Sequence, residues 1–240
     1  MTSHSIGALE IPGGWHERSV TVGEFQFSLL APANPDEFVN QLAEADESTL
    51  PRMRSDPYWA QLWTAALPFA SAVARADWPV GTTILELGCG IGLPGLVACQ
   101  RGWSTTFSDY VEEAVSLALE NARRHGFHSP QAEGLVLDWR DPPARSYDRL
   151  IASDVIYEER LHRPFLKAAS ALLAAHGEVW VADPGRSMCD DFLGLARKKG
   201  WQVALFAADD SPVAAPELGQ FRRIVLRRDE PTKESVIHHG

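Results

Sequence analysis

The chain has 240 residues, of which 45% are hydrophobic and 22% charged, a balance typical of a globular protein with one α/β domain and a modest extension. Its formal net charge of −10 disfavours a protein that binds nucleic acid by neutralising phosphates. No basic and apolar leader opens the sequence, and no apolar run reaches roughly 18 residues. We therefore expect a cytoplasmic protein that neither enters a membrane nor binds nucleic acid.

The three cysteines are Cys89, Cys99 and Cys189, and an odd number cannot pair completely. Their spacing does not match a zinc-ligand pattern. We therefore expect reduced thiols, as in an intracellular protein, and no metal site.

Residues 1–55 differ in sequence pattern from the regular alternation of strands and helices that follows, and they are predicted to form an N-terminal extension. Alternating apolar residues between Val20 and Leu29 indicate two short strands that turn at Gly23 and Glu24. A helix is expected over residues 36–45. Such an extension serves either as a lid over a small ligand or as a docking surface for a protein.

A long apolar helix is predicted from about Tyr58 to Ala74, with Asp56 as its cap and Pro57 in its first turn. Trp59 and Trp63 are four residues apart and would share one face of that helix. We expect Trp59 to pack on the sheet and Trp63 to reach a bound ligand from the side.

From Thr82 onward, short apolar strands alternate with segments of helix length. This alternation predicts a Rossmann-like α/β domain over residues 56–230, with a seven-stranded, mainly parallel sheet and helices on both faces. The loop 207–220 offers no crossover helix, so the last strand should return antiparallel, and residues 231–240 should form a flexible tail. Strands are expected at 82–87, 104–108, 134–137, 149–153, 178–182, 202–206 and 221–226, and helices at 94–101, 111–125, 161–175 and 187–199.

The first of these strands runs into a glycine-rich loop that lets the backbone approach a ligand closely. Part of the loop, Gly90–Gly95, also fits the dinucleotide pattern G-x-G-x-x-G, which is weak evidence alone. Glu86 stands two residues before the first glycine, where its charge would repel a pyrophosphate and suit the ammonium and sulfonium of S-adenosylmethionine (SAM). Pro94 removes a backbone N–H that would bind phosphate. SAM is therefore favoured, in a loop that reads Glu86-Leu87-Gly88-Cys89-Gly90-Ile91-Gly92.

Two further strands end in residues suited to a nucleoside. Asp109 follows the second strand, about twenty residues after the glycine loop, where a carboxylate can hold ribose hydroxyls. Asp138 ends the third strand and could accept the adenine amino group, while Trp139 offers a flat face for stacking. Trp139 would alternatively just cover the edge of the sheet.

The fourth strand runs into Asp154-Val155-Ile156-Tyr157, and its carboxyl end faces the same crevice as the glycine loop. Methyl transfer is a direct displacement, so the protein mainly aligns and desolvates the nucleophile. An amine must be neutral to attack, and Asp154 could orient it or help to remove its proton. Alternatively, Asp154 caps the following segment and Tyr157 only packs.

Together these motifs resemble the seven-β-strand protein-lysine methyltransferases, which are class I SAM-dependent enzymes. The resemblance rests on the Trp-containing helix, the glycine loop, Leu137-x-Trp139 and the Asp154-x-x-Tyr157 element, and it runs from about Trp59 to Ala182. One departure is Thr64, where many relatives carry Pro or Asp. The resemblance implies that Asp154 and Tyr157 place the substrate lysine, that Trp63 closes the cofactor site, and that the site is lined by Glu86, Gly88, Gly90, Gly92, Asp109 and Trp139.

The sequence thus predicts an N-methyltransferase that moves a methyl group from SAM to a lysine of a protein, leaving S-adenosylhomocysteine. A small-molecule N- or O-methyltransferase is the alternative within the same chemistry. A SAM-binding module without catalysis and a NAD-dependent reductase are alternatives of other classes. The acceptor, the number of methyl groups transferred and the oligomeric state are not readable from the residues.

Overall fold

The computed structural model describes residues 11, 13–37 and 57–228. Its main sheet has seven strands in the order β5-β4-β3-β6-β7-β9-β8, and all neighbours are parallel except those of β9. β9 is antiparallel to both β7 and β8, which confirms the Rossmann-like sheet with a reversed last strand. The strands are β3 (Thr83–Leu87), β4 (Ser104–Asp109), β5 (Ala132–Val136), β6 (Tyr147–Ser153), β7 (Leu173–Asp183), β8 (Trp201–Phe206) and β9 (Arg222–Arg228).

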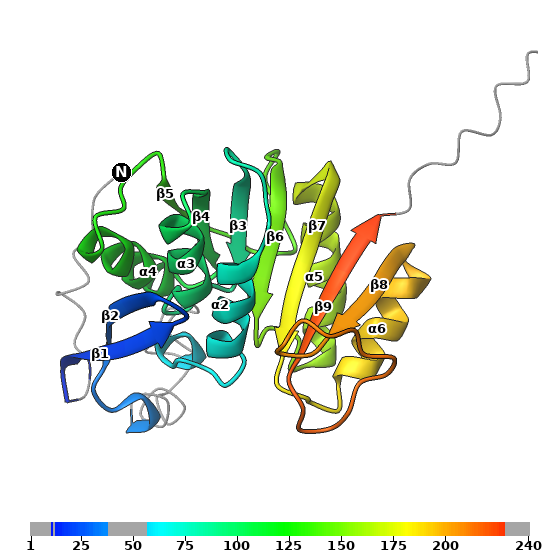
Figure 1. Ribbon diagram of the computed structural model, residues 1–240, viewed down its shortest axis with the longest axis horizontal. Helices are drawn as coiled ribbons and strands as arrows, with labels where there is room; N and C mark the ends of the chain where they lie inside the picture. The colour runs from blue at the N-terminus through cyan, green and yellow to red at the C-terminus, as the bar shows by residue number, and fades with distance from the viewer. Residues whose placement is uncertain (1–10, 12, 38–56, 229–240) are drawn as a thin grey trace, which may run out of the picture.

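Helices cover both faces of this sheet (Figure 1). One face packs against the first three helices and the other against the last two, so the molecule has one hydrophobic core on each side. In the described part of the chain, no helix has the length and apolar character needed to cross a membrane. The helices are α2 (Ala66–Arg75), α3 (Leu93–Gln100), α4 (Glu112–Arg124), α5 (Glu159–Leu172) and α6 (Cys189–Lys198).

The side chains of β3 show how the two cores divide. Ile84 belongs to the core under α2, α3 and α4, whereas Leu85 and Leu87 belong to the core under α5 and α6. Because successive side chains of a strand point to opposite faces, Glu86 lies on the α3 side. Both faces of β3 are therefore buried, as is usual for a central parallel strand.

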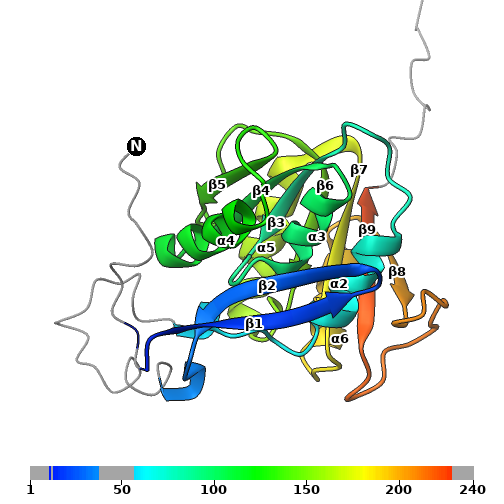
Figure 2. The same cartoon turned by 60° about the vertical axis from the view of Figure 1, so that its left-hand side comes forward.

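The N-terminal segment forms the predicted hairpin, with β1 (Trp15–Val22) paired antiparallel to β2 (Phe25–Pro32). Figure 2 shows the hairpin crossing the outer side of the α2–α3–α4 layer, so it adds a further layer on that face. Val22, Phe27 and Leu29 point into the core below and are buried. The expected turn at Gly23 and Glu24 is confirmed.

Asn121 on α4 ties the hairpin to the glycine loop. Its side chain is fully buried, accepts the Leu30 N–H at 2.7 Å and donates to the Leu30 and Ile91 carbonyl oxygens at 3.2 and 3.1 Å. We expect Asn121→Leu to lower the free energy of unfolding by about 2 kcal/mol, because it leaves these backbone groups without partners. Urea denaturation measures the change. Glu120→Ala, at the half-buried neighbouring position, removes only an ion pair with Arg123 at the surface and serves as control. Equal stability of the two variants would contradict the role of Asn121.

The long helix predicted over 58–74 is wrong: the structure has a 3-10 turn, η2 (Pro57–Ala60), an irregular stretch over 61–65, and then α2. Two interactions divert the backbone groups that a continuous helix would use. The indole N–H of Trp63 donates to the Tyr58 carbonyl oxygen at 2.7 Å, and the Ala65 N–H donates to Asp154 at 3.0 Å. Trp59 and Trp63 therefore do not share a helix face.

Three other expectations concern the ends of elements. The helix predicted to end at residue 175 ends at Leu172, because Leu173 is extended and pairs directly with Tyr147 of β6. Most of the helix expected over 36–45 lies outside the described residues, and so does the tail 231–240.

Candidate active site

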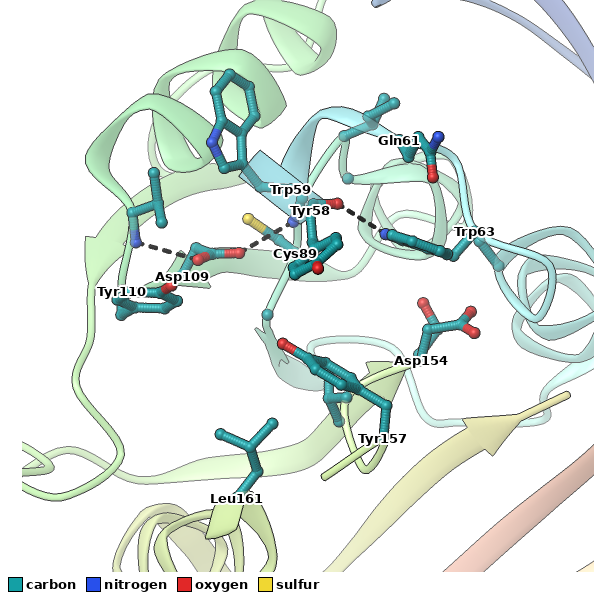
Figure 3. Close-up of a pocket in the computed structure, with 18 of the residues that line it drawn as sticks. Tyr58, Trp59, Gln61, Trp63, Cys89, Asp109, Tyr110, Asp154, Tyr157 and Leu161 are labelled. Carbon is teal, nitrogen blue, oxygen red and sulfur yellow. Dashed lines mark hydrogen bonds between the residues drawn. The ribbon is translucent and has the colours of Figure 1, made fainter. Parts of the chain in front are cut away.

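A cavity of about 640 Å³ lies at the carboxyl ends of β3, β4 and β6, which is the size range of a cofactor or small-molecule site. Its walls come from η2 and the stretch after it, the glycine loop, the turns after β4, β5 and β6, and the start of α5 (Figure 3). Neither β1 nor β2, both of which are described in full, contributes to the lining. The predicted site residues that line the cavity are Trp63, Gly88, Gly90, Gly92, Asp109, Asp138, Trp139, Asp154 and Tyr157.

The glycine positions of this loop are packed too closely for a side chain. Gly92 has a φ of 88°, and a Cβ there would lie 2.9 Å from the Cβ of Ala118 on α4. A Cβ on Gly90 would lie 3.1 Å from the Trp59 carbonyl oxygen. The loop is thus held between α4 and η2, which leaves its backbone free to border the cavity.

Asp109 at the end of β4 fastens the glycine loop. One carboxylate oxygen accepts the Gly90 N–H at 3.2 Å and the other accepts the Val111 N–H at 3.1 Å (Figure 3). Each carboxylate oxygen can accept more than one hydrogen bond, so ribose hydroxyls can still bind here. Only 7% of Asp109 is exposed, and the residue borders the cavity.

The carboxylate of Asp138 is bound to Arg140. The Arg140 guanidinium donates to both oxygens, and this contact holds the pKa of the Asp138 carboxyl below its usual range. An adenine amino group would therefore have to share the carboxylate with Arg140. The neighbouring Trp139 packs edge-on against Phe165 at a centroid distance of 5.3 Å while it borders the cavity.

Glu86 is the one predicted cofactor residue that does not line the cavity. It is buried on the α3 side of β3, and its carboxyl accepts the Gly95 N–H at 3.1 Å. Burial raises the pKa of this carboxyl well above its usual range. Glu86 therefore fastens the start of α3, and the idea that its charge faces the cofactor needs correction.

This position predicts a pH-dependent stability. Because the folded-state pKa of Glu86 is raised above its unfolded-state value, stability that is present at low pH is lost as the pH rises through the folded-state pKa. Glu86→Gln keeps an acceptor for the Gly95 N–H and removes the titration. Its stability relative to the unmodified protein should grow with pH, by at most about 1.4 kcal/mol per pH unit. Urea denaturation at several pH values checks this, and a constant difference would contradict it.

Asp154 borders the cavity directly after β6. It adopts a φ of 61°, a left-handed conformation that Asp tolerates better than most residues. Its Oδ2 accepts the Ala65 N–H at 3.0 Å, and its Oδ1 accepts from Arg186 at 2.7 Å. Burial raises the pKa of this carboxyl, and the Arg186 guanidinium opposes the rise.

Three aromatic rings surround the space beside Asp154. The ring of Tyr58 lies 6.0 Å from that of Trp63 and 6.3 Å from that of Tyr157, measured between centroids. Figure 3 shows these rings and Asp154 around the same part of the cavity. Aromatic faces with a nearby carboxylate suit the alkyl chain and the cationic head of an amine.

Two important residues of the site were missed in the sequence. Tyr58 reaches the cavity because the chain breaks after η2, which a helical pattern does not reveal. Arg186 follows β7 in Asp183-Pro184-Gly185-Arg186, and a charged residue after a parallel strand was a signal that could have identified it, because such strands end at one rim.

The cysteines are free and buried. Cys89 lies in the glycine loop and borders the cavity, and burial raises its pKa well above the usual range. Burial raises the pKa of both Cys99 and Cys189 to about 12, so neither is a reactive thiolate at neutral pH. No group of side chains able to hold a metal ion occurs among the residues that the structure describes.

A family model described as lysine methyltransferase matches residues 59–197, which is more than half of the chain. The chain belongs to this lysine methyltransferase family. The match contains the second half of η2, the glycine loop, Asp109, the Asp154-to-Tyr157 element and Arg186. The resemblance inferred from the sequence is thereby confirmed, and the family implies SAM as cofactor.

Two curated relatives of this chain are protein methyltransferases. The histidine protein methyltransferase 1 homolog of Dictyostelium discoideum is 30% identical over 107 residues, which cover 42% of this chain and 35% of that protein. The electron transfer flavoprotein beta subunit lysine methyltransferase of Danio rerio is 25% identical and is matched over 65% of this chain and 60% of its own length. The chain thus spans between about a third and three fifths of these relatives.

Solved structures show the same fold. A TehB-like SAM-dependent methyltransferase from Corynebacterium glutamicum superposes with a TM-score of 0.56 at 22% identity, over 68% of this chain and 88% of that one. The magnesium protoporphyrin IX methyltransferase of Synechocystis, solved with bound SAM, has a TM-score of 0.54 at 16% identity, over 82% of this chain and 92% of its own. At these identities the likeness concerns the fold alone.

Proposed function

We propose that this chain transfers a methyl group from SAM to the side-chain amine of a lysine in a protein substrate. The observation that carries the proposal is one continuous cavity, with Asp109 and the glycine loop at one end and Asp154 and Tyr157 at the other. A cofactor site and an acceptor site that share a cavity can hold their ligands in contact, which is what a direct displacement requires.

The residues present fit SAM. The backbone of the glycine loop can border its methionine portion, while Asp109, Trp139 and the turn after β5 can hold the nucleoside. Pro94 also borders the cavity and has no N–H to offer a phosphate, which argues against a dinucleotide. Bound SAM supplies an electrophilic methyl group on a sulfonium.

The acceptor end fits a lysine. The rings of Tyr58, Trp63 and Tyr157 can enclose its alkyl chain, and Asp154 can orient its amine. The amine nitrogen must lose a proton to solvent before its lone pair takes the methyl group. The N–C bond then forms as the C–S bond breaks, and S-adenosylhomocysteine is left.

The test is to incubate the purified protein with methyl-labelled SAM and a lysate of its own organism, then to map the label by mass spectrometry. We expect methylated lysine in one or a few proteins. Label in small metabolites alone would contradict the protein substrate. Label on histidine alone, the residue named for one relative, would contradict the lysine acceptor. A cytoplasmic location belongs to the same proposal, and substrate found in that fraction would support it.

A further inference from the structure

Arg186 lies in the turn between β7 and α6 and contacts two carboxylates. Its guanidinium is 2.7 Å from Asp154 and 3.4 Å from Asp183. The fully buried Asp183 also accepts the backbone N–H groups of Gly185 and Arg186, each at 2.8 Å. Asp183 thus fixes the turn, and the turn brings Arg186 to Asp154.

Among the described residues, Arg186 is the only cation in an ion pair with Asp154. The other groups that act on that carboxylate are the Ala65 N–H and Asp183 of β7, while Tyr157 and Arg160 border the same cavity. Arg222 of β9 lies behind Asp183, at 3.7 Å. The charge that Asp154 presents to the cavity therefore depends mainly on Arg186.

The charge matters because a lysine enters as an ammonium and reacts as a neutral amine. An unpaired carboxylate stabilises the ammonium and so raises the pKa of the acceptor. A carboxylate already paired with a guanidinium has no net charge to offer, although its free lone pairs can still accept a hydrogen bond.

We propose that Arg186 is a positioning residue that acts through Asp154, cancelling the charge of the acceptor-side carboxylate so that the amine is oriented without being held as an ammonium. This inference rests on the proposed function. It assigns a role to a residue that does not itself line the cavity and that reaches it only through Asp154.

The proposal predicts how the cavity binds a cation as the pH changes. In Arg186→Met, only the Ala65 N–H still opposes the effect of burial on the pKa of Asp154, so the carboxylate ionises at a higher pH than in the unmodified protein. The ionised carboxylate of Asp154 then has no guanidinium partner, so it binds a cation in the cavity more strongly. The unmodified protein should bind a cation weakly and with little change across neutral pH.

The probe is butyltrimethylammonium, whose charge is permanent, so any pH dependence comes from the protein. Binding is followed by the NMR shift of the Trp63 indole N–H, assigned with Trp63→Phe, with S-adenosylhomocysteine present. We expect the affinity of Arg186→Met to rise as the pH is raised and to end at least about tenfold above that of the unmodified protein. Arg186→Lys, which keeps the charge, should follow the unmodified protein.

Two controls separate this role from a structural one. Arg75→Met removes an arginine that is also paired with an aspartate at 2.7 Å, Asp210, but does not border the cavity, and it should leave probe binding unchanged. Asp154→Asn combined with Arg186→Met should abolish the pH dependence. Parallel profiles for Arg186→Met and the unmodified protein would overturn the role of Arg186. Absence of binding in every form would instead overturn the acceptor site itself.

Discussion

Replacing Asp109 with Ala should weaken the binding of S-adenosylhomocysteine by about 1–3 kcal/mol, or roughly 5- to 150-fold. The carboxylate holds the N–H groups of Gly90 and Val111, and it borders the cavity where ribose hydroxyls would bind. The substitution therefore removes a ligand contact and loosens the loop in one step. Calorimetric titration measures the change in affinity.

Asp141→Ala is the matched control for Asp109→Ala, because Asp141 is exposed and does not line the cavity. The affinity of Asp141→Ala for S-adenosylhomocysteine should equal that of the unmodified protein. Unchanged affinity of Asp109→Ala for S-adenosylhomocysteine would mean that the end of β4 does not supply the ribose site. A parallel titration with NADH tests the cofactor class, since tight NADH binding without S-adenosylhomocysteine binding would contradict a SAM site.

The main sheet was predictable because its signals are local. Apolar strands alternating with helix-length segments require parallel crossovers, and the missing helix in the loop before Arg222 requires an antiparallel return. Element ends were less predictable. Leu173 leaves α5 and enters β7 without a loop, and only its pairing with Tyr147, far away in the sequence, decides where the helix stops.

The broken helix after η2 shows what a local pattern cannot contain. The apolar spacing from Tyr58 to Ala74 fits a helix, yet the Ala65 N–H is taken by Asp154, which is 89 residues away. A side chain from the turn after β6 thus competes with the helix for a backbone donor. The acceptor wall is formed by this irregular stretch, so its shape could not be derived from the helical spacing.

Glu86 was one reason to infer SAM as the cofactor, and the family implies the same cofactor, but the side chain of Glu86 does not line the cavity. Its charge was expected to face the cofactor, but alternation along β3 turns it toward α3, where it binds the Gly95 N–H. Leu85 and Leu87 on the opposite face were the available signal. Pro94 does border the cavity, and because it has no N–H to offer a phosphate, it still favours SAM over a dinucleotide.

Replacing Asp154 with Ala should reduce the rate of methyl transfer by about 100-fold or more while the affinity for S-adenosylhomocysteine changes little. Asp154 borders the cavity at the proposed acceptor site and makes no hydrogen bond to the glycine loop in the described structure. Its loss removes the group that orients the amine. The measurements are initial rates on the protein identified by mass spectrometry and calorimetry with S-adenosylhomocysteine.

Asp154→Ala also leaves the Ala65 N–H without its acceptor and Arg186 without one of its carboxylates, so the acceptor wall itself is weakened. Asp154→Asn separates the two effects, because its amide oxygen can still accept from Ala65 while the negative charge is gone. If the carboxylate is needed at the amine, both to accept its hydrogen bond and to balance Arg186, the Asn variant folds with near-normal stability and is still slow. If Asp154 only supports the wall, Asn restores the rate, and loss of cofactor affinity in both variants would place the residue in the cofactor site instead.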